Sequence, residues 1–250
     1  METFIENWQW IDYEEVASTN DLAMEMQLTS DKQKLVISAK CQTKGRGRRG
    51  RNWISEEGNL FFSQLFKTEI LPSELAFVSS LSIAKTILEF NSKAQVQLKW
   101  PNDVLINGKK VCGILIEAQP DGAAILGIGV NISSFPKEET LNYRATSLKE
   151  EKIDTSREAF LCKYLQVFEK TIAQCKNVGF AYISREWQSY AYKMNEPIIV
   201  RGEKKQQEGI FKGIDEKGFL LLEQKGKIYK ISVGEVFPTA AGLKDDYRVQ

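Results

Sequence analysis

Hydrophobic residues recur along this chain with two periods, one typical of helices and one typical of strands. Helical spacing predicts four helices, the first of which follows the capping sequence Ser18-Thr19-Asn20-Asp21. They cover 22–26, 72–88, 157–176 and 180–190. Apolar runs rich in β-branched and aromatic residues predict strands at 35–42, 58–66, 96–100, 104–106, 111–118 and 123–132. This mixture predicts an α+β domain over 1–192, with a mixed β-sheet flanked by helices.

The pattern changes near residue 195, where short apolar runs alternate with charged turns. The runs lie at 198–200, 209–211, 219–222 and 228–231, and they repeat about every ten residues. Regular short strands of this kind are typical of small β-barrels. The sequence therefore predicts a second, all-β domain over 193–250.

Composition narrows the class of protein. The 250 residues are 42% hydrophobic and 27% charged, which is ordinary for a globular chain. No apolar run approaches the roughly 20 residues of a membrane span, and the acidic start does not resemble a signal peptide. Cys41, Cys112, Cys162 and Cys175 lie far apart, so we expect reduced thiols and a cytoplasmic location. The absence of histidine excludes Ser–His–Asp hydrolysis and histidine acid–base catalysis.

Charge adds one prominent feature, the basic loop from Lys44 to Arg51. It holds five cations and three glycines, whereas the whole chain has a net charge of only +1. Predicted strands precede and follow it, so it belongs to a folded core rather than to a tail. Arginine side chains match the geometry of phosphate and carboxylate groups. The loop therefore predicts a lid over an anionic ligand, and the alternative is a nucleic-acid-binding patch.

Further candidate residues lie at strand ends and turns. Lys99-Trp100-Pro101-Asn102-Asp103 places a lysine, an aromatic ring and a carboxylate together, although Pro-Asn-Asp is also ordinary turn chemistry. Lys109 and Lys110 open an apolar strand, either to keep its edge soluble or to reach a pocket. The glycines of 127–132 permit close backbone approach or mark a bulge. Together these residues suit a carboxylic acid and a nucleoside triphosphate, and hence adenylation by positioning and electrostatics.

With these motifs, the chain resembles biotin–protein ligases. The matching stretches occur in the order expected for that family, and they are 18–20, 42–53, 58–60, 99–103, 110–115 and 129–131. The resemblance implies a sheet of the class II synthetase type with a C-terminal SH3-like barrel. It implies formation of biotinyl-5′-AMP from biotin and MgATP, and then biotin transfer to a lysine of a biotin carboxyl carrier protein.

The resemblance also implies roles for particular residues. Arg48, Lys110 and Asp103 would be catalytic. Biotin would contact Ser18, Thr19, Asn20, Gln42, Gly45, Arg46, Gly47, Arg48 and Lys110. The nucleotide would contact Arg48, Arg51, Trp53, Asn102, Lys110 and Asn131. No protein ligand for a metal is predicted, so Mg²⁺ would be carried by ATP.

Two departures and two rival functions accompany this resemblance. The matching pattern begins within the first twenty residues, so the DNA-binding domain of bifunctional members is not expected, nor is DNA binding. Residues 231–236 lack the arginine that some members place near the nucleotide. A lipoate or octanoate ligase of the same superfamily is the enzymatic alternative, and a nucleic-acid-binding module is the alternative from another class. Neither a membrane partner nor a particular oligomer is predicted, and a homodimer is left open.

Overall fold

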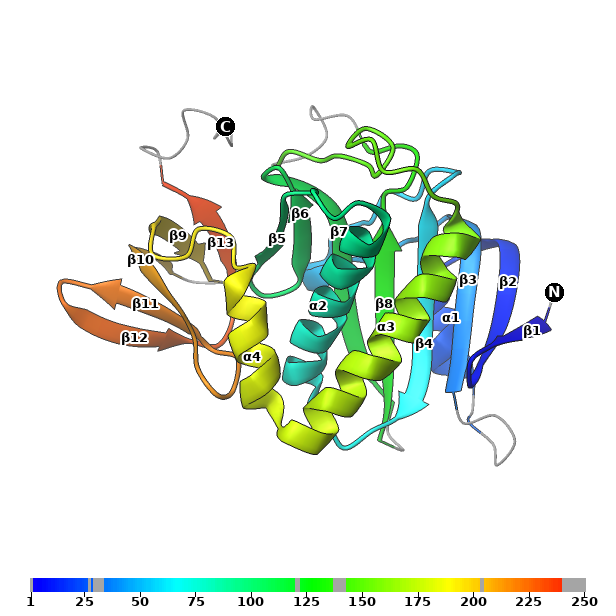
Figure 1. The fold of residues 1–250 in the computed structure, drawn as a ribbon, viewed down its shortest axis with the longest axis horizontal. Coiled ribbons are helices and arrows are strands. Elements are labelled where there is room, and N and C mark those ends of the chain that lie inside the picture. Colours follow the sequence, from blue (N-terminus) through cyan, green and yellow to red (C-terminus); the bar gives the residue numbers. More distant parts are fainter. Residues whose placement is uncertain are drawn as a thin grey trace.

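The larger part of the chain is a mixed eight-stranded sheet. We describe a computed structural model for residues 2–26, 28, 34–119, 122–136, 143–202 and 205–239. Its strand order is β1-β2-β3-β4-β8-β7-β6-β5, and only the β2–β3 pair is parallel. The strands are β1 Glu2–Ile5, β2 Trp8–Val16, β3 Lys34–Gln42, β4 Leu60–Lys67, β5 Val96–Lys99, β6 Asp103–Ile106, β7 Lys109–Ala118 and β8 Ala123–Val130. The predicted mixed sheet with flanking helices is confirmed (Figure 1).

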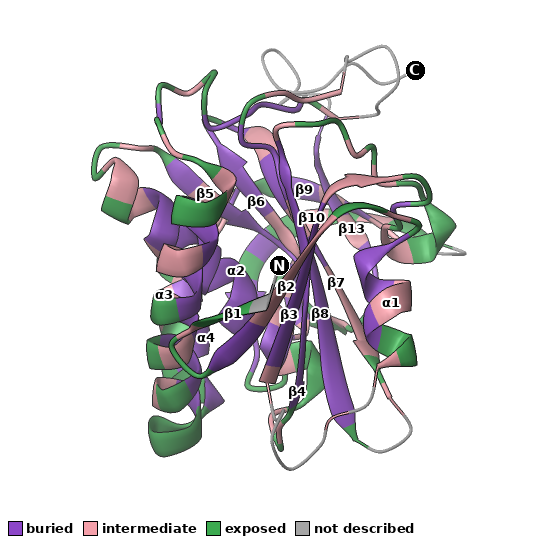
Figure 2. Cartoon of the chain, turned by 90° about the vertical axis from the view of Figure 1, so that its right-hand side faces the viewer, coloured by how far each residue is buried: buried purple, intermediate pink, exposed green. Residues whose placement is uncertain are grey.

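Helices cover the two faces of this sheet unequally. The longer ones, α2 Pro72–Phe90, α3 Arg157–Val178 and α4 Phe180–Ser189, lie together on one face. The short helix α1 Thr19–Glu25 lies on the other face, over a small apolar cluster that includes Ile37 and Ile125 (Figure 2). Because α1 covers only part of its face, the rest of that face is available for a cavity.

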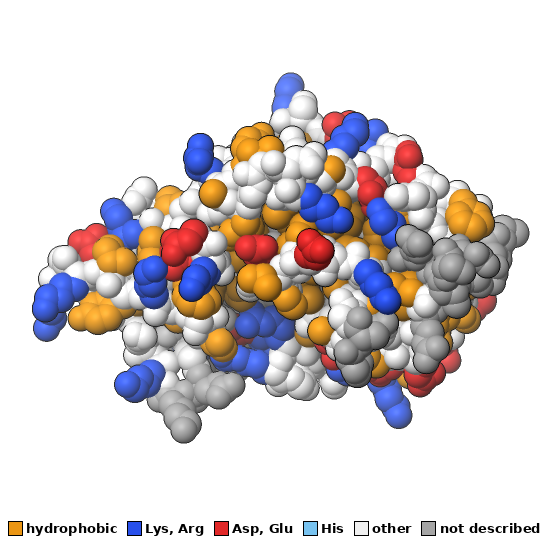
Figure 3. Space-filling model, turned by 90° about the horizontal axis from the view of Figure 1, so that it is seen from below, with side chains coloured by type: hydrophobic (Ala, Val, Ile, Leu, Met, Phe, Trp, Pro, Cys, Tyr) orange, Lys and Arg blue, Asp and Glu red, His pale blue; other side chains and the backbone are white. Residues whose placement is uncertain are grey.

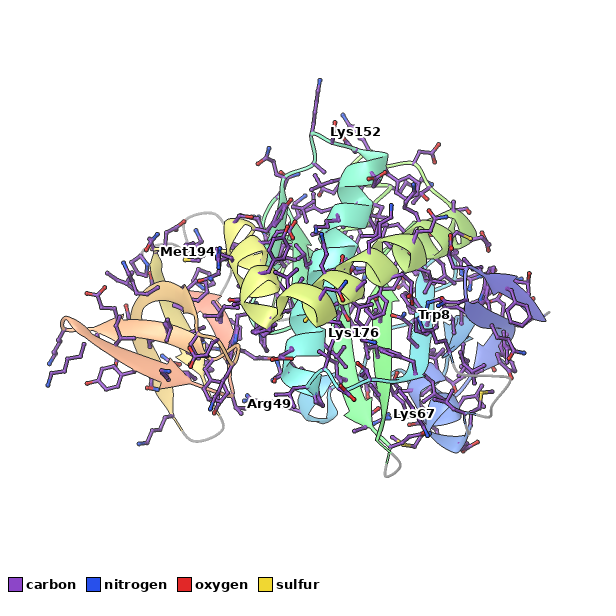
Figure 4. All side chains as sticks on the ribbon, turned by 60° about the horizontal axis from the view of Figure 1, so that its bottom comes forward. Trp8, Arg49, Lys67, Lys152, Lys176 and Met194 are labelled. Atoms are coloured by element: carbon purple, nitrogen blue, oxygen red, sulfur yellow. The ribbon has the colours of Figure 1, made fainter. Side chains whose placement is uncertain are left out.

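Aromatic packing fixes the larger helices to the sheet. Trp8, labelled in Figure 4, packs edge-on against Phe66 and Phe168, and its indole nitrogen donates to Glu169 at 2.8 Å. Edge-to-face ring pairs of this kind stabilise beyond the area they bury. None of the helices in the described ranges is long and apolar enough to cross a membrane.

The C-terminal unit is a five-stranded antiparallel sheet, with order β12-β11-β10-β9-β13. Its strands are β9 Pro197–Arg201, β10 Gln206–Ile214, β11 Leu220–Gln224, β12 Lys227–Ile231 and β13 Glu235–Pro238. Within the described residues β12 and β13 form opposite edges, so the predicted SH3-like unit is a five-stranded antiparallel sheet that is not closed into a full barrel. The predicted boundary at 192/193 falls between α4 and β9, and it stays a prediction.

This unit packs on the turn that follows β5. The indole of Trp100 donates to the carbonyl of Gly218 at 3.0 Å. Gly218 has φ +77°, and an added Cβ would lie 2.5 Å from the ring of Phe77. The small sheet therefore lies beside the residues that the sequence placed in the candidate site.

Candidate active site

The basic loop, the start of α1 and residues of strands β3, β6, β7 and β8 line a cavity of about 530 Å³. It lies on the sheet face that α1 leaves partly uncovered. Most of the predicted site residues line it, namely Ser18, Thr19, Asn20, Gln42, Arg46, Gly47, Arg48, Arg51, Trp53, Asn102, Asp103 and Lys110. Residues far apart in sequence are thus brought to one place.

One end of the cavity is a network of neutral polar side chains. Oε1 of Gln42 accepts hydrogen bonds from the Thr19 amide at 2.9 Å and from the Thr19 hydroxyl at 3.2 Å. The Ser63 hydroxyl lies 2.8 Å from Thr19 Oγ1 and 2.6 Å from Asn20 Oδ1. Nδ2 of Asn20 donates to Glu117 at 2.8 Å. Because these groups fix one another, a ligand meets donors and acceptors in set directions.

The start of α1 positions this end. Ser18 is the N-cap, in an extended conformation, and its hydroxyl accepts from the amide of Asp21 at 3.3 Å. The predicted helix cap is therefore present. The cap leaves Thr19 and Asn20, both buried, directed at the sheet. Gly127 makes room there, because a Cβ at this position would collide with the Asn20 amide.

A glycine floor lies in the middle of the cavity. Gly113 of β7 and Gly129 of β8 are register partners, and the Trp53 ring lies against both. A Cβ on Gly113 would lie 2.7 Å from the Trp53 ring, and one on Gly129 would be closer still. The buried indole nitrogen of Trp53 has no hydrogen-bond partner among the described residues. These glycines therefore serve close approach, as the sequence suggested for Gly129.

The other end of the cavity is charged. Lys110 Nζ lies 2.7 Å from Asp103 Oδ1, with both side chains less than one-fifth exposed. Burial opposes the charged form of both groups, but their mutual attraction raises the pKa of Lys110, and Lys110 with Lys99 lowers the pKa of Asp103. The pair is therefore held as ammonium and carboxylate.

Arg48 lies beside this pair. Its Nη1 donates to Asn102 Oδ1 at 3.0 Å, and the amide of Asn102 donates to the carbonyl of Ile114. Burial lowers the pKa of Arg48, while the Asp103 carboxylate opposes that effect. The guanidinium remains charged, since arginine titrates far above neutral pH. A second cation thus faces the cavity.

The basic loop is folded by its own backbone and by distant carboxylates. The Gly47 amide donates to Arg51 O at 2.7 Å, and the Trp53 amide donates to Gly45 O at 2.9 Å. Arg46 pairs with Asp21 at 2.6 Å and with Glu117 at 2.8 Å. Arg51 pairs with Glu235 of the small sheet. Arg49, labelled in Figure 4, is exposed on the side of the loop toward that sheet. The high local charge is therefore partly neutralised by partners that the sequence did not indicate.

Two predicted residues do not line the cavity. Gly45 is a buried residue of the loop, and an added Cβ there would collide with the carbonyl of Trp53. Asn131 is buried and donates to the carbonyl of Thr146 at 2.9 Å. Asn131 therefore supports the segment after β8, and a direct nucleotide contact does not follow from its position. Lys109, which precedes Lys110 in the sequence, is not a lining residue, and its Nζ lies 3.0 Å from Oε1 of Glu151.

Sequence reasoning missed several residues at the cavity. Tyr143 is a clear case, because it belongs to none of the motifs recognised in the sequence, yet Lys110 Nζ lies 5.0 Å from its ring centroid. Ser63 could have been found as a hydroxyl in the middle of an otherwise apolar strand. Ser63 supports Thr19 and Asn20 without lining the cavity. Besides Tyr143, the lining residues outside the predicted set are Asn52, Ile54, Gly113, Ile114, Leu115, Gly127, Ile128 and Gly129.

No metal-binding cluster is present in the part of the chain that is described. Those residues contain no group of three or more histidine, cysteine, aspartate or glutamate side chains placed to hold an ion. Asp103, the carboxylate in the cavity, is already engaged by Lys110. The residues present therefore do not form a dedicated cation site.

The fold and the cavity together define a class of protein. A mixed sheet carries a pocket with a neutral hydrogen-bonding end and a buried cationic end, as expected of a ligase that activates a carboxylic acid with a nucleotide. Residues 13–133 match the Biotin/lipoate A/B protein ligase family, and residues 193–237 match the Biotin protein ligase C terminal domain. The chain belongs to the biotin–protein ligase family.

Individual relatives agree. A biotin–[acetyl-CoA-carboxylase] ligase of Paracoccus denitrificans is 35% identical, over 80% of this chain and 89% of its own length. A bifunctional ligase/repressor of Bacillus subtilis is 34% identical, over 88% of this chain and 71% of its own length. The structure of an Aquifex aeolicus biotin protein ligase in complex with biotin and ATP superposes with a TM-score of 0.81 at 33% identity, covering 91% of this chain and 97% of that one.

Proposed function

We propose that the protein is an ATP-dependent biotin–protein ligase. The observation that carries this proposal is the cavity itself, in which a neutral polar end and the Lys110–Asp103 pair lie at opposite sides of a glycine floor. Biotin has a matching polarity, with an uncharged cyclic urea at one end and a carboxylate at the other.

In the first half-reaction, a carboxylate oxygen of biotin attacks the α-phosphorus of ATP. The bond from that phosphorus to the bridging oxygen breaks, pyrophosphate leaves, and biotinyl-5′-AMP forms. Charge grows on the phosphoryl oxygens in the transition state, so Lys110 and Arg48 are the groups that stabilise it. Ser18, Thr19, Asn20 and Gln42 hold the urea, so that the carboxylate reaches these cations in a reactive position.

In the second half-reaction, the amine of a carrier lysine attacks the acyl carbon of the anhydride. An amide forms, AMP leaves, and the amine loses its proton. Asp103 is the group that orients the incoming amine, because Lys110 and Lys99 hold its pKa below the usual value and keep it ionised despite burial. The acceptor is a biotin carboxyl carrier protein.

The remaining assignments follow from position. Gly45, Arg46 and Gly47 belong to the loop that encloses biotin, while Arg51, Trp53 and Asn102 contact the nucleotide. Asn131 acts on the nucleotide side through the segment that it supports. Since the described residues offer no cation site, Mg²⁺ enters with the phosphates of ATP.

Two alternatives are less well supported. A lipoate or octanoate ligase would need only an apolar tail pocket, and the polar network around Asn20 and Gln42 would have no use there. A nucleic-acid-binding module would need a broad basic surface. In the view of Figure 3, lysine and arginine side chains are interspersed with acidic ones. The absence of DNA binding, the cytoplasmic location and the oligomeric state stay predictions.

The direct test mixes the full chain with ATP, pyrophosphatase and one acid, and measures phosphate release. Biotin should give release, while octanoate and lipoate should not, and Lys110→Ala should abolish most of the signal. Transfer is then followed by mass spectrometry of a biotin carboxyl carrier domain. Release with lipoate or octanoate, but none with biotin, would overturn the proposal.

A further inference from the structure

Glu117 makes contacts that the adenylation chemistry does not require. It lies on β7, two residues beyond the cavity-lining Leu115, and is not itself among the lining residues. Its side chain is 23% exposed. One carboxylate reaches both Asn20 at the neutral end of the cavity and Arg46 of the basic loop. Because Glu117 does not line the cavity but contacts two residues that do, any effect it has on a ligand must pass through Asn20 and Arg46.

The contact with Asn20 fixes the orientation of an amide. An amide can be turned over, exchanging its oxygen and its NH₂ group at little steric cost. An ionised carboxylate only accepts hydrogen bonds, so Nδ2 of Asn20 must face Glu117 and Oδ1 must face Ser63. The second N–H of Asn20 is then directed away from Glu117, in a side chain that is buried and lines the cavity.

The contact with Arg46 closes the loop over the same end. Both terminal nitrogens of Arg46 donate to Glu117, at 3.0 and 2.8 Å, in the two-point geometry that favours arginine–carboxylate pairs. Asp21 also contacts Arg46, at 2.6 Å, whereas the Asn20 amide donates to Glu117. The chain thus offers two carboxylates on one arginine, only one of which also orients the amide.

The end of β7 holds α1 in a second way. Nε2 of Gln119 donates to the carbonyl oxygens of Ala23, Met24 and Met26, at the carboxyl end of the helix. The helix therefore has a fixed position without Glu117. A change at Glu117 should therefore alter the orientation of the Asn20 side chain without moving α1.

We propose that Glu117 is a positioning residue for recognition of the urea end of biotin. It holds the Asn20 amide in one orientation and ties Arg46 across the same end of the cavity. This inference rests on the proposed function. Because Glu117 acts at the end remote from the reacting carboxylate, its contribution belongs to binding of biotin and not to the chemical step.

The test compares Glu117→Gln with Asp21→Asn in the full chain. Glutamine keeps the size but presents both a donor and an acceptor, so Asn20 can turn over. We expect Glu117→Gln to raise the biotin Kd by calorimetry, and the KM, on the order of tenfold. We expect kcat at saturating biotin to stay within about twofold. Asp21→Asn, which removes one of the two carboxylates on Arg46 and leaves the contact between Asn20 and Glu117, should change Kd by less than about threefold.

Three results would overturn the inference. They are an unchanged Kd in Glu117→Gln, a lower kcat with an unchanged KM, and an equal effect of Asp21→Asn. If Glu117→Gln does not fold, Glu117→Asp is the alternative variant. It keeps the charge but shortens the side chain by one methylene, and it should raise the biotin Kd likewise. Failure of the unmodified chain to bind biotin at all would instead refute the proposed function.

Discussion

The two ends of the cavity differ in their functional groups, since one offers neutral hydrogen-bonding side chains and the other offers charged ones. At the neutral end, Gln42 accepts hydrogen bonds from Thr19, and the Ser63 hydroxyl links Thr19 to Asn20. At the charged end, Asp103 and Lys110 are buried as ions. Preformed hydrogen bonds recognise the ground state of a ligand, whereas buried charges matter most where charge develops in a reaction. Mutations at the two ends should therefore separate KM from kcat.

The largest effect is expected at the charged end. Lys110→Ala should lower kcat for pyrophosphate release on the order of 10²-fold, because a cation at the attacked phosphorus is lost. The biotin Kd should change much less than kcat, because Lys110 is one of several biotin contacts. Lys109→Ala is the matched control, since that lysine pairs with Glu151 outside the cavity. Equal losses in the two variants would remove the distinction between these lysines.

The charged end also costs stability, and this cost depends on pH. Burial lowers the pKa of Lys99 from 10.5 to about 8, although Asp103 opposes the change. Between these two values the unfolded chain binds a proton that the folded chain does not, so stability rises with pH across that window. The rise attributable to Lys99 is at most about 3.5 kcal/mol, at about 1.4 kcal/mol per pKa unit.

Lys99→Met keeps the length of the side chain and should remove that rise. Urea unfolding of both proteins at about pH 7.5 to 10.5 measures it, because this range covers both the folded pKa of about 8 and the unfolded value of 10.5. The methionine variant should be the more stable of the two at the lower end. Parallel stability curves for the two proteins would mean that Lys99 does not titrate in this range.

A smaller effect is expected where the loop meets the charged end. Arg48→Gly should still form biotinyl-AMP but release it, and lysines other than the carrier's should then be labelled on the order of tenfold more. Arg49→Gly is the control, because Arg49 is exposed and its φ of 58° suits glycine. Mass spectrometry of a mixture of acceptors gives the ratio. Retention of the normal acceptor choice would show that Arg48 does not seal the intermediate.

The smallest effect is expected at the neutral end. Gln42→Ala removes two acceptor contacts with Thr19, and the biotin KM should rise about five- to tenfold, as one to two hydrogen bonds are worth. The kcat should be unchanged. Thr43→Ala is the control, because Thr43 is the exposed sequence neighbour, and both kcat and KM should stay unchanged in it. A fall in kcat for Gln42→Ala would mean that the two ends are coupled.

Much of the fold followed from local pattern, but its edges did not. The helices near 72–88 and 157–176 have strong periodicity, and they were found close to their observed bounds. The first two strands, over 2–16, were missed because acidic residues interrupt their apolar positions and β1 is an edge strand. The strand 235–238 has too few residues to show a recognisable hydrophobic pattern, and it forms by pairing with β9.

The site shows the same division. Its motif residues were recognisable because particular side chains stand at particular turns, and most of them line one cavity. The partners of the loop were not recognisable. Glu117 and Glu235 lie 71 and 184 residues from the arginines that they hold. Contacts of that range depend on sheet order, which no local pattern specifies.

The indole nitrogen of Trp53 has no hydrogen-bond partner among the described residues, and this makes its fluorescence a reporter of the cavity. The other four tryptophans donate to fixed partners, namely Glu169, Ser38, Gly218 and Ser80. Trp53 alone among the five lies in the cavity without such a bond, and Lys110 Nζ is 5.4 Å from its ring. Ligand entry changes the polarity and charge around this one ring. Emission of the whole protein therefore carries a constant background from four fluorophores and a signal from the fifth, and the signal disappears in Trp53→Phe.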